Sequence, residues 1–262
     1  MKGMFRLSRG RVLGWFASVL GVSFSHVGHA ANLERIEFEG AIYHVLRVDR
    51  ADFPRLDLRW LGQDGKPLGS FGPLLQEAAK EGRQIEFATN AGIYERGPKP
   101  CGLTITDGKE LVPLNLAKGE GNFYLHPNGV FFLDDKRGAG VMTGEEYGKS
   151  GLQPRLATQS GPILLRQGKI HPAFNVNSPN RRLRNAVGVR ASDGQVVFVM
   201  SDREDRVKGR VTFHQLSLFF LHLGCQDALF LDGDISDVLV NPPAGATVTP
   251  NTFAGMFVLW KK

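Results

Sequence analysis

Short apolar runs that end in glycine and polar residues recur along the whole chain. In "NAVGVRASDGQVVFVMS" (185–201), two such runs flank Asp193-Gly194, a dipeptide that favours a two-residue hairpin turn. Asp107-Gly108 and Gln167-Gly168 divide two further pairs of runs in the same way. The pattern therefore predicts many short strands joined by tight turns, with neighbouring strands paired antiparallel.

Helical periodicity is confined to a few segments. Residues 72–83 ("GPLLQEAAKEGR") and 212–224 ("TFHQLSLFFLHLG") each place apolar side chains at helical spacing and end at a glycine. Residues 33–61 read as two antiparallel strands joined through 52–54, and residues 137–151 read as a glycine-rich connection. Because helices and strands never alternate regularly, we expect an α+β fold with mixed, largely antiparallel sheets and two or three helices.

The first 30 residues have the pattern of a secretory leader. Lys2 and three arginines precede an apolar stretch at 12–24, and small residues at Gly28 and Ala30 suit a cleavage site. We expect cleavage after Ala30, leaving a single domain at residues 31–262 and a protein that works in the periplasm or outside a bacterial cell. The alternative, an uncleaved anchor, is disfavoured because the run is shorter than the ~20 residues of a spanning helix.

Charge gives no indication of a nucleic-acid partner. The formal net charge is +6, but the leader holds four basic residues and no acid, so 28 basic side chains face 26 acidic ones without it. Aromatic and basic residues are not interleaved as in single-strand binding proteins. We expect neither a nucleic-acid partner nor, after cleavage, a membrane partner.

Two cysteines remain beyond the leader, Cys101 and Cys225. In an oxidising compartment they could pair and close a long loop, which is worth about 4 kcal/mol in the chain-entropy model. The sequence does not decide whether the two thiols can meet. A catalytic thiol is disfavoured, since no histidine stands beside either cysteine in a nucleophile motif.

Polar residues gather where several apolar runs end. Four of these places combine polar side chains with a glycine, and a fifth sets arginines just before a strand. Glycine there allows a close backbone approach to a ligand or a positive φ, although each place alone is compatible with a plain turn. The residues are Asn90, Asn128, the pair Gln159 and Ser160, the group Asp232, Asp234 and Ser236, and the arginines 181, 182 and 184.

Taken together, these motifs resemble the phosphodiester glycosidase family, whose mammalian member is the uncovering enzyme that removes N-acetylglucosamine from a phosphodiester. The chain is most similar to a bacterial branch of that family. Six motifs occur in the family's order across about residues 85–240. They are "NAGIY" (90–94), "GL" (102–103), "PNGVF" (127–131), "QSGPILL" (159–165), "RNAVGV" (184–189) and "ALFLDGDIS" (228–236).

The resemblance implies that Asn90, Arg184, Asp232 and Ser236 line an active-site cavity, with Gln159 and Ser160 close by. These residue types suit a sugar-1-phosphodiester. An arginine fork can bind two phosphate oxygens, and a carboxylate can act as acid, base or nucleophile at the glycosidic carbon. The resemblance therefore assigns catalysis to Asp232, Arg184 and Asn90.

We expect substrate contacts from six further side chains: Ser236, Gln159, Ser160, Asn128, His171 and Asp234. His171 precedes a proline in a predicted loop, where a role in proton transfer and a structural role stay equally open. His214 lies near the edge of an apolar helical stripe, which favours packing or a surface position.

One motif departs from the family. Where the uncovering enzyme's branch has Asp-Gly-Gly-Gly-Ser, this chain has Asp232-Gly-Asp234-Ile235-Ser236. The added carboxylate could repel a phosphate, or it could help Asp232 and Asp237 hold a divalent cation. We expect no cofactor, because Asp-x-Asp-x-x-Asp lacks the oxygen-rich loop of a dedicated calcium site.

The leading hypothesis is an exported hydrolase that cleaves a sugar from a sugar-1-phosphodiester, with a glycan or sugar phosphate as its substrate. The alternative is a non-catalytic module on the same fold that binds envelope glycan or glycerophosphate groups. A purely structural role is disfavoured because buried polar groups cost free energy unless they are hydrogen-bonded.

Overall fold

The computed structural model describes Met1 and residues 33–243 and 245–262. Apart from Met1, the predicted leader at 1–30 lies outside the described residues. Within the described ranges, no helix is long and apolar enough to cross a membrane.

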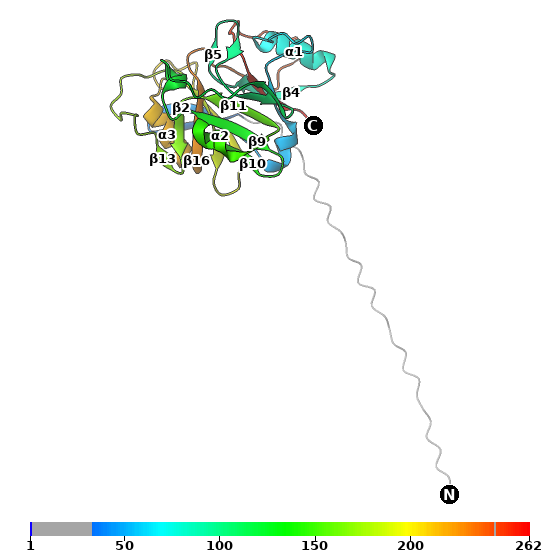
Figure 1. Ribbon diagram of the computed structural model, residues 1–262, viewed down its shortest axis with the longest axis horizontal. Helices are drawn as coiled ribbons and strands as arrows, with labels where there is room; N and C mark the ends of the chain where they lie inside the picture. The colour runs from blue at the N-terminus through cyan, green and yellow to red at the C-terminus, as the bar shows by residue number, and fades with distance from the viewer. Residues whose placement is uncertain (2–32, 244) are drawn as a thin grey trace.

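The described strands form three larger sheets and one two-stranded ribbon, and every strand pair in these ranges is antiparallel (Figure 1). The seven-stranded sheet has the order β1-β2-β15-β14-β16-β12-β13. Its strands are β1 (Glu34–Phe38), β2 (Ala41–Val48), β12 (Ile163–Arg166), β13 (Lys169–Ile170), β14 (Asn185–Arg190), β15 (Val196–Ser201) and β16 (Cys225–Asp232).

The two remaining sheets have five and four strands. The five-stranded sheet, in the order β10-β9-β11-β7-β8, contains β7 (Thr104–Thr106), β8 (Lys109–Val112), β9 (Gly129–Asp134), β10 (Gly138–Thr143) and β11 (Leu156–Ser160). The four-stranded sheet, in the order β17-β4-β18-β3, contains β3 (Leu56–Arg59), β4 (Ile85–Asn90), β17 (Val238–Val240) and β18 (Met256–Trp260). The ribbon is β5 (Tyr94–Glu95) with β6 (Lys99–Pro100).

One central core lies between the three sheets. In β16, Leu229 and Leu231 face this core, whereas Ala228 and Phe230 face the opposite side of the sheet. Because both faces of such strands are buried, their sequences are continuously apolar even though the pairing is antiparallel. Strands with only one buried face would instead alternate apolar and polar residues. Strands β9 and β18, like β16, bury apolar side chains on both of their faces.

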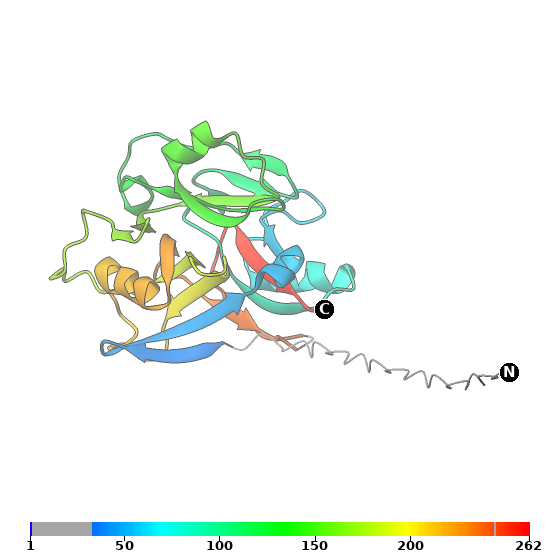
Figure 2. The ribbon, with the colours of Figure 1, turned by 90° about the horizontal axis from the view of Figure 1, so that it is seen from below.

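Each sheet has one α-helix against its outer face. Helix α1 (Phe71–Lys80) packs on the four-stranded sheet, α2 (Gly144–Ser150) on the five-stranded sheet and α3 (Phe213–His222) on the seven-stranded sheet. Figure 2 shows the five-stranded sheet and α2, in green, above the seven-stranded sheet and α3. The predicted α+β class and the antiparallel pairing are thereby confirmed.

Three local predictions differ from the structure. Asp193-Gly194 lies in a loop longer than two residues between β14 and β15, in which Gly194 N donates to Arg190 O and only the glycine has positive φ. Helix α2 falls in the segment expected to be a glycine-rich connection, and a capping box between Thr143 and Glu146 starts it. Strands β2 and β3 are separated by a short 3-10 helix, η1 (Arg50–Arg55), and belong to different sheets. The actual hairpin in this region turns at Glu39-Gly40, where both residues have positive φ.

The predicted turns at Asp107-Gly108 and Gln167-Gly168 are hairpin turns with positive φ at both residues, joining β7 to β8 and β12 to β13. A second 3-10 helix, η2 (Asn122–Tyr124), precedes β9. The register then brings several polar residues to one end of the sheets. Asp232 pairs with Asn185, Asn90 with Met256, and Ser160 with Gly129.

Candidate active site

The buried side-chain amide of Asn185 joins the seven-stranded sheet to the four-stranded sheet, at the end of the sheets where Asp232 lies. The Nδ2 atom of Asn185, in β14, donates to Thr89 Oγ1 at 2.9 Å and to both Asn90 O and Asn90 Oδ1 at 3.0 Å. Asn185 is 1% exposed, so each of these hydrogen bonds replaces water that the amide has lost. The carboxyl end of β4 is thereby held against the strand pair that carries Asp232.

Asp232 is the last residue of β16 and is only partly exposed. Burial raises the pKa of its carboxyl group to about 6; the Gly233 N–H, which donates to Oδ1 at 2.7 Å, opposes the shift, and the Asp234 charge adds to it. Burial, and then the Asp232 charge, also raises the pKa of Tyr94. The Asp232 carboxyl group can therefore gain or lose a proton near neutral pH.

Arg184 is a buried cation just before β14, with 2% exposure. Its Nε donates to Val211 O at 2.8 Å and its Nη2 to Asn180 O at 3.0 Å, while the guanidinium lies 3.7 Å from the centre of the Phe213 ring. Burial lowers its pKa to about 10, so it stays charged at neutral pH. Among the described residues, Nη1 has no hydrogen-bond partner, which leaves N–H donors for a ligand.

These two groups share one small pocket. It has a volume of about 260 Å³ and combines carboxylates, guanidinium groups and amides. Its lining residues are Asn122, Asn180, Arg182, Arg184, Phe230, Asp232, Gly233 and Asp234. Arg184, Asp232 and Asp234, three of the residues predicted from the sequence, are thus brought together, and a cation and a carboxyl group face one space.

Asn90 and Ser236 lie in a buried layer of the same region and are not among the residues that line the pocket. Asn90 Nδ2 donates to Ser236 Oγ at 3.2 Å, and Asn90 Oδ1 accepts from Asn185. Ser236 has no exposed surface, and its carbonyl oxygen accepts from Arg203 Nη1 at 3.0 Å. The geometry gives both residues a supporting position around the turn that follows Asp232.

Gln159 and Asn128 form a second buried network, and Ser160 beside them makes its own buried hydrogen bond to β16. The Gln159 amide makes four hydrogen bonds, two of them with the backbone of Asn115 and a third with Leu103 N. The fourth joins Gln159 to Asn128 Oδ1, while Ser160 Oγ donates to Leu231 O. These side chains fix the 102–128 segment against β11 and β16, and none of them lines the Asp232 pocket.

His171 also has its polar atoms occupied by backbone groups. Its Nδ1 accepts from Ala173 N at 3.2 Å, so the ring proton is on Nε2, which donates to His126 O at 3.0 Å. Burial lowers the pKa of His171, which favours the neutral ring. His214 lies on α3 and is partly exposed.

The disulfide considered from the sequence is not formed, and both Cys101 and Cys225 are free thiols. Cys225 opens β16, whereas Cys101 is close enough to Asp232, at the strand's other end, for that charge to add to the burial that raises its pKa. An eight-residue strand spans about 25 Å, far beyond the reach of a disulfide.

A metal site at Asp232, Asp234 and Asp237 was the other open alternative. Across the described ranges, no cluster of three or more His, Cys, Asp or Glu side chains is placed to hold a metal ion. Asp234 instead pairs with Arg182, and Asp237 pairs with Arg203 at 3.3 Å.

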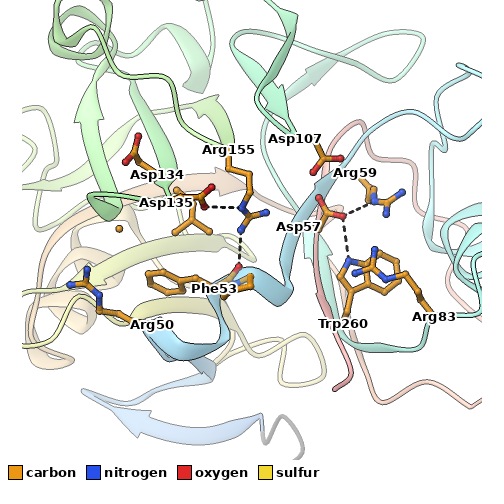
Figure 3. A pocket seen from close by; sticks show the side chains of 13 residues that line it. Arg50, Phe53, Asp57, Arg59, Arg83, Asp107, Asp134, Asp135, Arg155 and Trp260 are labelled. Atoms are coloured by element: carbon orange, nitrogen blue, oxygen red, sulfur yellow. Dashed lines mark hydrogen bonds and ion pairs between the residues drawn. The ribbon is translucent and has the colours of Figure 1, made fainter.

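A larger cavity, of about 610 Å³, lies at the opposite end of the sheets (Figure 3). Four of its eight charged side chains pair with one another. Asp57 accepts from Arg59 and from Trp260 Nε1, and Arg155 donates to Asp135 and to Phe53 O. The two ion pairs compete with a charged ligand, and none of the six sequence motifs contributes a residue to this cavity, so the smaller pocket at Asp232 is the better candidate for chemistry.

Sequence reasoning assigned no role to three polar residues of the pocket or to one residue that supports it. Arg182 stands in the quoted arginine cluster and Asn185 follows Arg184 in the "RNAVGV" motif, so both were within reach of the pattern. Asn122 and Asn180 come from irregular segments, where no periodicity marks them. Their position depends on how the loops fold over the sheet ends.

Comparison with known proteins identifies the family of this chain. The family model for phosphodiester glycosidase matches residues 83–258. The chain is 33% identical over 183 residues to YigE, an uncharacterised protein of Escherichia coli (strain K12), covering 70% of this chain and 68% of YigE.

Two solved structures share the fold. The catalytic domain of zebrafish N-acetylglucosamine-1-phosphodiester alpha-N-acetylglucosaminidase, auto-inhibited by its pro-peptide, aligns with a TM-score of 0.59 and 16% identity, covering 88% of this chain and 82% of that one. A Burkholderia pseudomallei K96243 protein, described as a candidate exported protein, aligns with a TM-score of 0.50 and 13% identity, covering 83% and 73%.

Proposed function

Because this chain belongs to the phosphodiester glycosidase family, we propose that it hydrolyses a sugar-1-phosphodiester, releasing the sugar and leaving a phosphomonoester. The observation that carries the proposal is the pocket in which buried Arg184 and the carboxyl group of Asp232 face one space. A phosphodiester joined to a glycosidic carbon requires both kinds of group within a few ångströms of each other.

Arg184 is the phosphate-binding group in this proposal. Its position is fixed by the hydrogen bonds to Val211 O and Asn180 O and by the ring of Phe213. Such a guanidinium needs little reorganisation to bind an anion, and its charge interacts more strongly there than in bulk water. As the bond between the sugar and the phosphate oxygen breaks, Arg184 stabilises the negative charge that moves onto the phosphate.

Asp232 acts as the general base. A phosphomonoester is a good leaving group that Arg184 already stabilises, so it leaves without a proton from the enzyme. The harder task is to activate water for attack on the glycosidic carbon. Ionised Asp232 accepts the water proton while the oxygen bonds to that carbon, and its charge also favours an oxocarbenium-like transition state.

Asn90 and Ser236 act on this reaction through position. Asn185 holds the Asn90 oxygen, so that the Asn90 amide nitrogen is directed at Ser236 Oγ in the turn after Asp232. Fixing that turn fixes the carboxyl group of Asp232 relative to Arg184. Gln159, Ser160 and Asn128 support the segments around the pocket in the same indirect way, and His171 does so through His126.

We also propose that the protein is exported. The basic and apolar pattern of residues 1–30, with Gly28 and Ala30 before the expected cleavage point, supports this location. A phosphodiester-linked sugar of the bacterial envelope is then the substrate class that the site would meet.

The test is sugar release from N-acetylglucosamine 1-(methyl phosphate) and a panel of other sugar-1-phosphodiesters by the purified protein, with and without a chelator. We expect wild-type turnover and a loss of about 10³-fold or more in Asp232→Asn, the scale of a lost general base with its electrostatic role. The matched control is Asp135→Asn, the same charge change in the larger cavity. Tight binding without turnover across the panel would instead indicate the non-catalytic binding module.

A further inference from the structure

An ion pair stands at the pocket in a place where it adds little to stability. Arg182 Nη1 and Asp234 Oδ2 are 3.3 Å apart, and their side chains are 62% and 54% exposed. Pairs this exposed contribute little to the free energy of folding, because solvent screens them. Both residues nevertheless line the pocket of Arg184 and Asp232, so the charge of this pair acts mainly on what enters that pocket.

The charge of Asp234 reaches both central groups of the site. Burial is the main cause of the lowered pKa of Arg184, and the Asp234 charge opposes that shift. Burial is also the main cause of the raised pKa of Asp232, and the Asp234 charge adds to it. A pocket of about 260 Å³ is only about 8 Å across, within one Debye length in physiological salt.

The proposed reaction changes the charge of the phosphate. The substrate phosphodiester carries one negative charge, whereas the product phosphomonoester carries between −1.5 and −2 near pH 7. Of the two arginines that line the pocket, Arg182 is paired with Asp234 and only Arg184 lacks a carboxylate partner at ion-pair distance. When Asp232 is ionised it offsets the charge of Arg184, so the lining carries no excess positive charge and disfavours the dianionic product more than the monoanionic substrate.

We propose that Asp234 makes the pocket select phosphodiesters over phosphomonoesters, and that it thereby promotes release of the product. This inference rests on the proposed function and adds the charge class of the ligand that the site holds. It assigns a role to the carboxylate that stands between Gly233 and Ile235. Asp234 is a specificity-determining residue here and takes no part in proton transfer.

The expected size of the effect follows from Coulomb's law. At about 8 Å and an effective dielectric constant of about 60, one pair of unit charges changes a binding constant about threefold. Removing the Asp234 charge should therefore tighten binding of a monoanion about threefold and of a dianion about tenfold. The ratio of the two affinities then shifts about threefold.

The experiment compares two probes of nearly the same shape, dimethyl phosphate and methyl phosphate, by calorimetric titration at pH 8, where the first carries one negative charge and the second two. We expect Asp234→Asn to tighten methyl phosphate binding more than dimethyl phosphate binding. Arg182→Gln should change both affinities in the opposite direction, because it leaves Asp234 without its partner. High salt should reduce both effects.

Asp135→Asn, which makes the same charge change in the other cavity, is the control and should alter neither affinity. If Asp234→Asn changes both affinities equally, or neither, the selectivity proposal is wrong while the proposed function stands. If no variant binds either probe, the Arg184 pocket is not an anion site, and both proposals fail. Loss of both probes in Arg184→Gln would identify the pocket as the place of binding.

Turnover gives an independent readout if the protein is active. Competitive inhibition by the released phosphomonoester should become about tenfold stronger in Asp234→Asn, while KM for the diester falls only about threefold. An unchanged inhibition constant would contradict the role in product release.

Discussion

The two ends of the sheets differ in how their charged side chains are arranged around a cavity. At the Asp232 end, a buried guanidinium and a carboxyl group of raised pKa face a small pocket, and hydrogen bonds among buried amides hold that pocket in place. At the other end, a larger cavity is lined by four arginines and four aspartates, of which Asp57 pairs with Arg59 and Asp135 with Arg155. Cavity size alone does not separate the two candidates, whereas the motif residues and the raised pKa of Asp232 favour the smaller pocket.

The largest expected effect separates activity from stability at Asp232. Its pKa rises from 3.8 in the unfolded chain to about 6 in the fold, so the folded state loses stability as pH rises between these values. The loss is complete above pH 6 and is at most about 3 kcal/mol, since the side chain is partly exposed. Asp232→Asn cannot ionise at this position, so the variant avoids this loss of stability, but it also loses turnover.

Thermal unfolding of wild type and Asp232→Asn at several pH values checks this prediction. The variant should be the more stable protein at pH 8, and the difference should vanish below about pH 4. In parallel, kcat/KM of the wild type should rise about tenfold from pH 5 to 7 if Asp232 is the base. A rate that falls over this range would assign it the role of acid.

At the opposite end of the sheets, we expect a substitution to lower stability and leave activity unchanged. Asp57 is 7% exposed and accepts from Leu58 N, Arg59 Nε and Trp260 Nε1. Asp57→Ala leaves these donors unpaired, and we expect a loss of about 3 kcal/mol in the free energy of unfolding. Denaturant titration measures it, and kcat/KM of the folded fraction should stay within twofold. A large drop in kcat/KM would place function in the larger cavity.

Asn185 should affect both properties. Asn185→Ala removes the donor shared by Thr89 and Asn90, and we expect about 1–3 kcal/mol of destabilisation. Because Asn90 then loses its orientation, kcat should fall about tenfold with little change in KM. Ser160→Ala, which breaks a neighbouring buried hydrogen bond to Leu231 O, is the matched control. Equal falls in kcat for both variants would leave Asn185 a merely structural residue.

The smallest expected effect is that of removing an exposed ion pair, and it serves as the reference for the other substitutions. Lys66 and Asp64 are 3.8 Å apart and their side chains are 82% and 64% exposed. Asp64→Asn should change the free energy of unfolding by less than about 0.5 kcal/mol and leave turnover unchanged. A larger change would mean that solvent screening is weaker on this surface than assumed at either end.

The sequence by itself determined the features that depend on neighbouring residues. Runs such as "ALFL" and "VFFL" specified strands because apolar β-formers between turn residues have few other choices. Asp107-Gly108 and Gln167-Gly168 specified hairpin turns because both positions require positive φ. The motif order specified the family, and Arg184 and Asp232, which the resemblance predicts as site residues, line one pocket.

Tertiary structure decided which polar side chains share the pocket. Asn90 meets Ser236 across 146 residues of sequence and meets Asn185 across 95, and Gln159 meets Asn115 across 44. No local sequence pattern spans such separations. Residues that the same kind of motif predicts therefore lie in three places: some line the pocket, some hold the turn after Asp232, and Gln159 and Asn128 bond to each other elsewhere. The thiols of Cys101 and Cys225 stay apart for the same reason, because β16 lies between their positions and its length is a property of the fold.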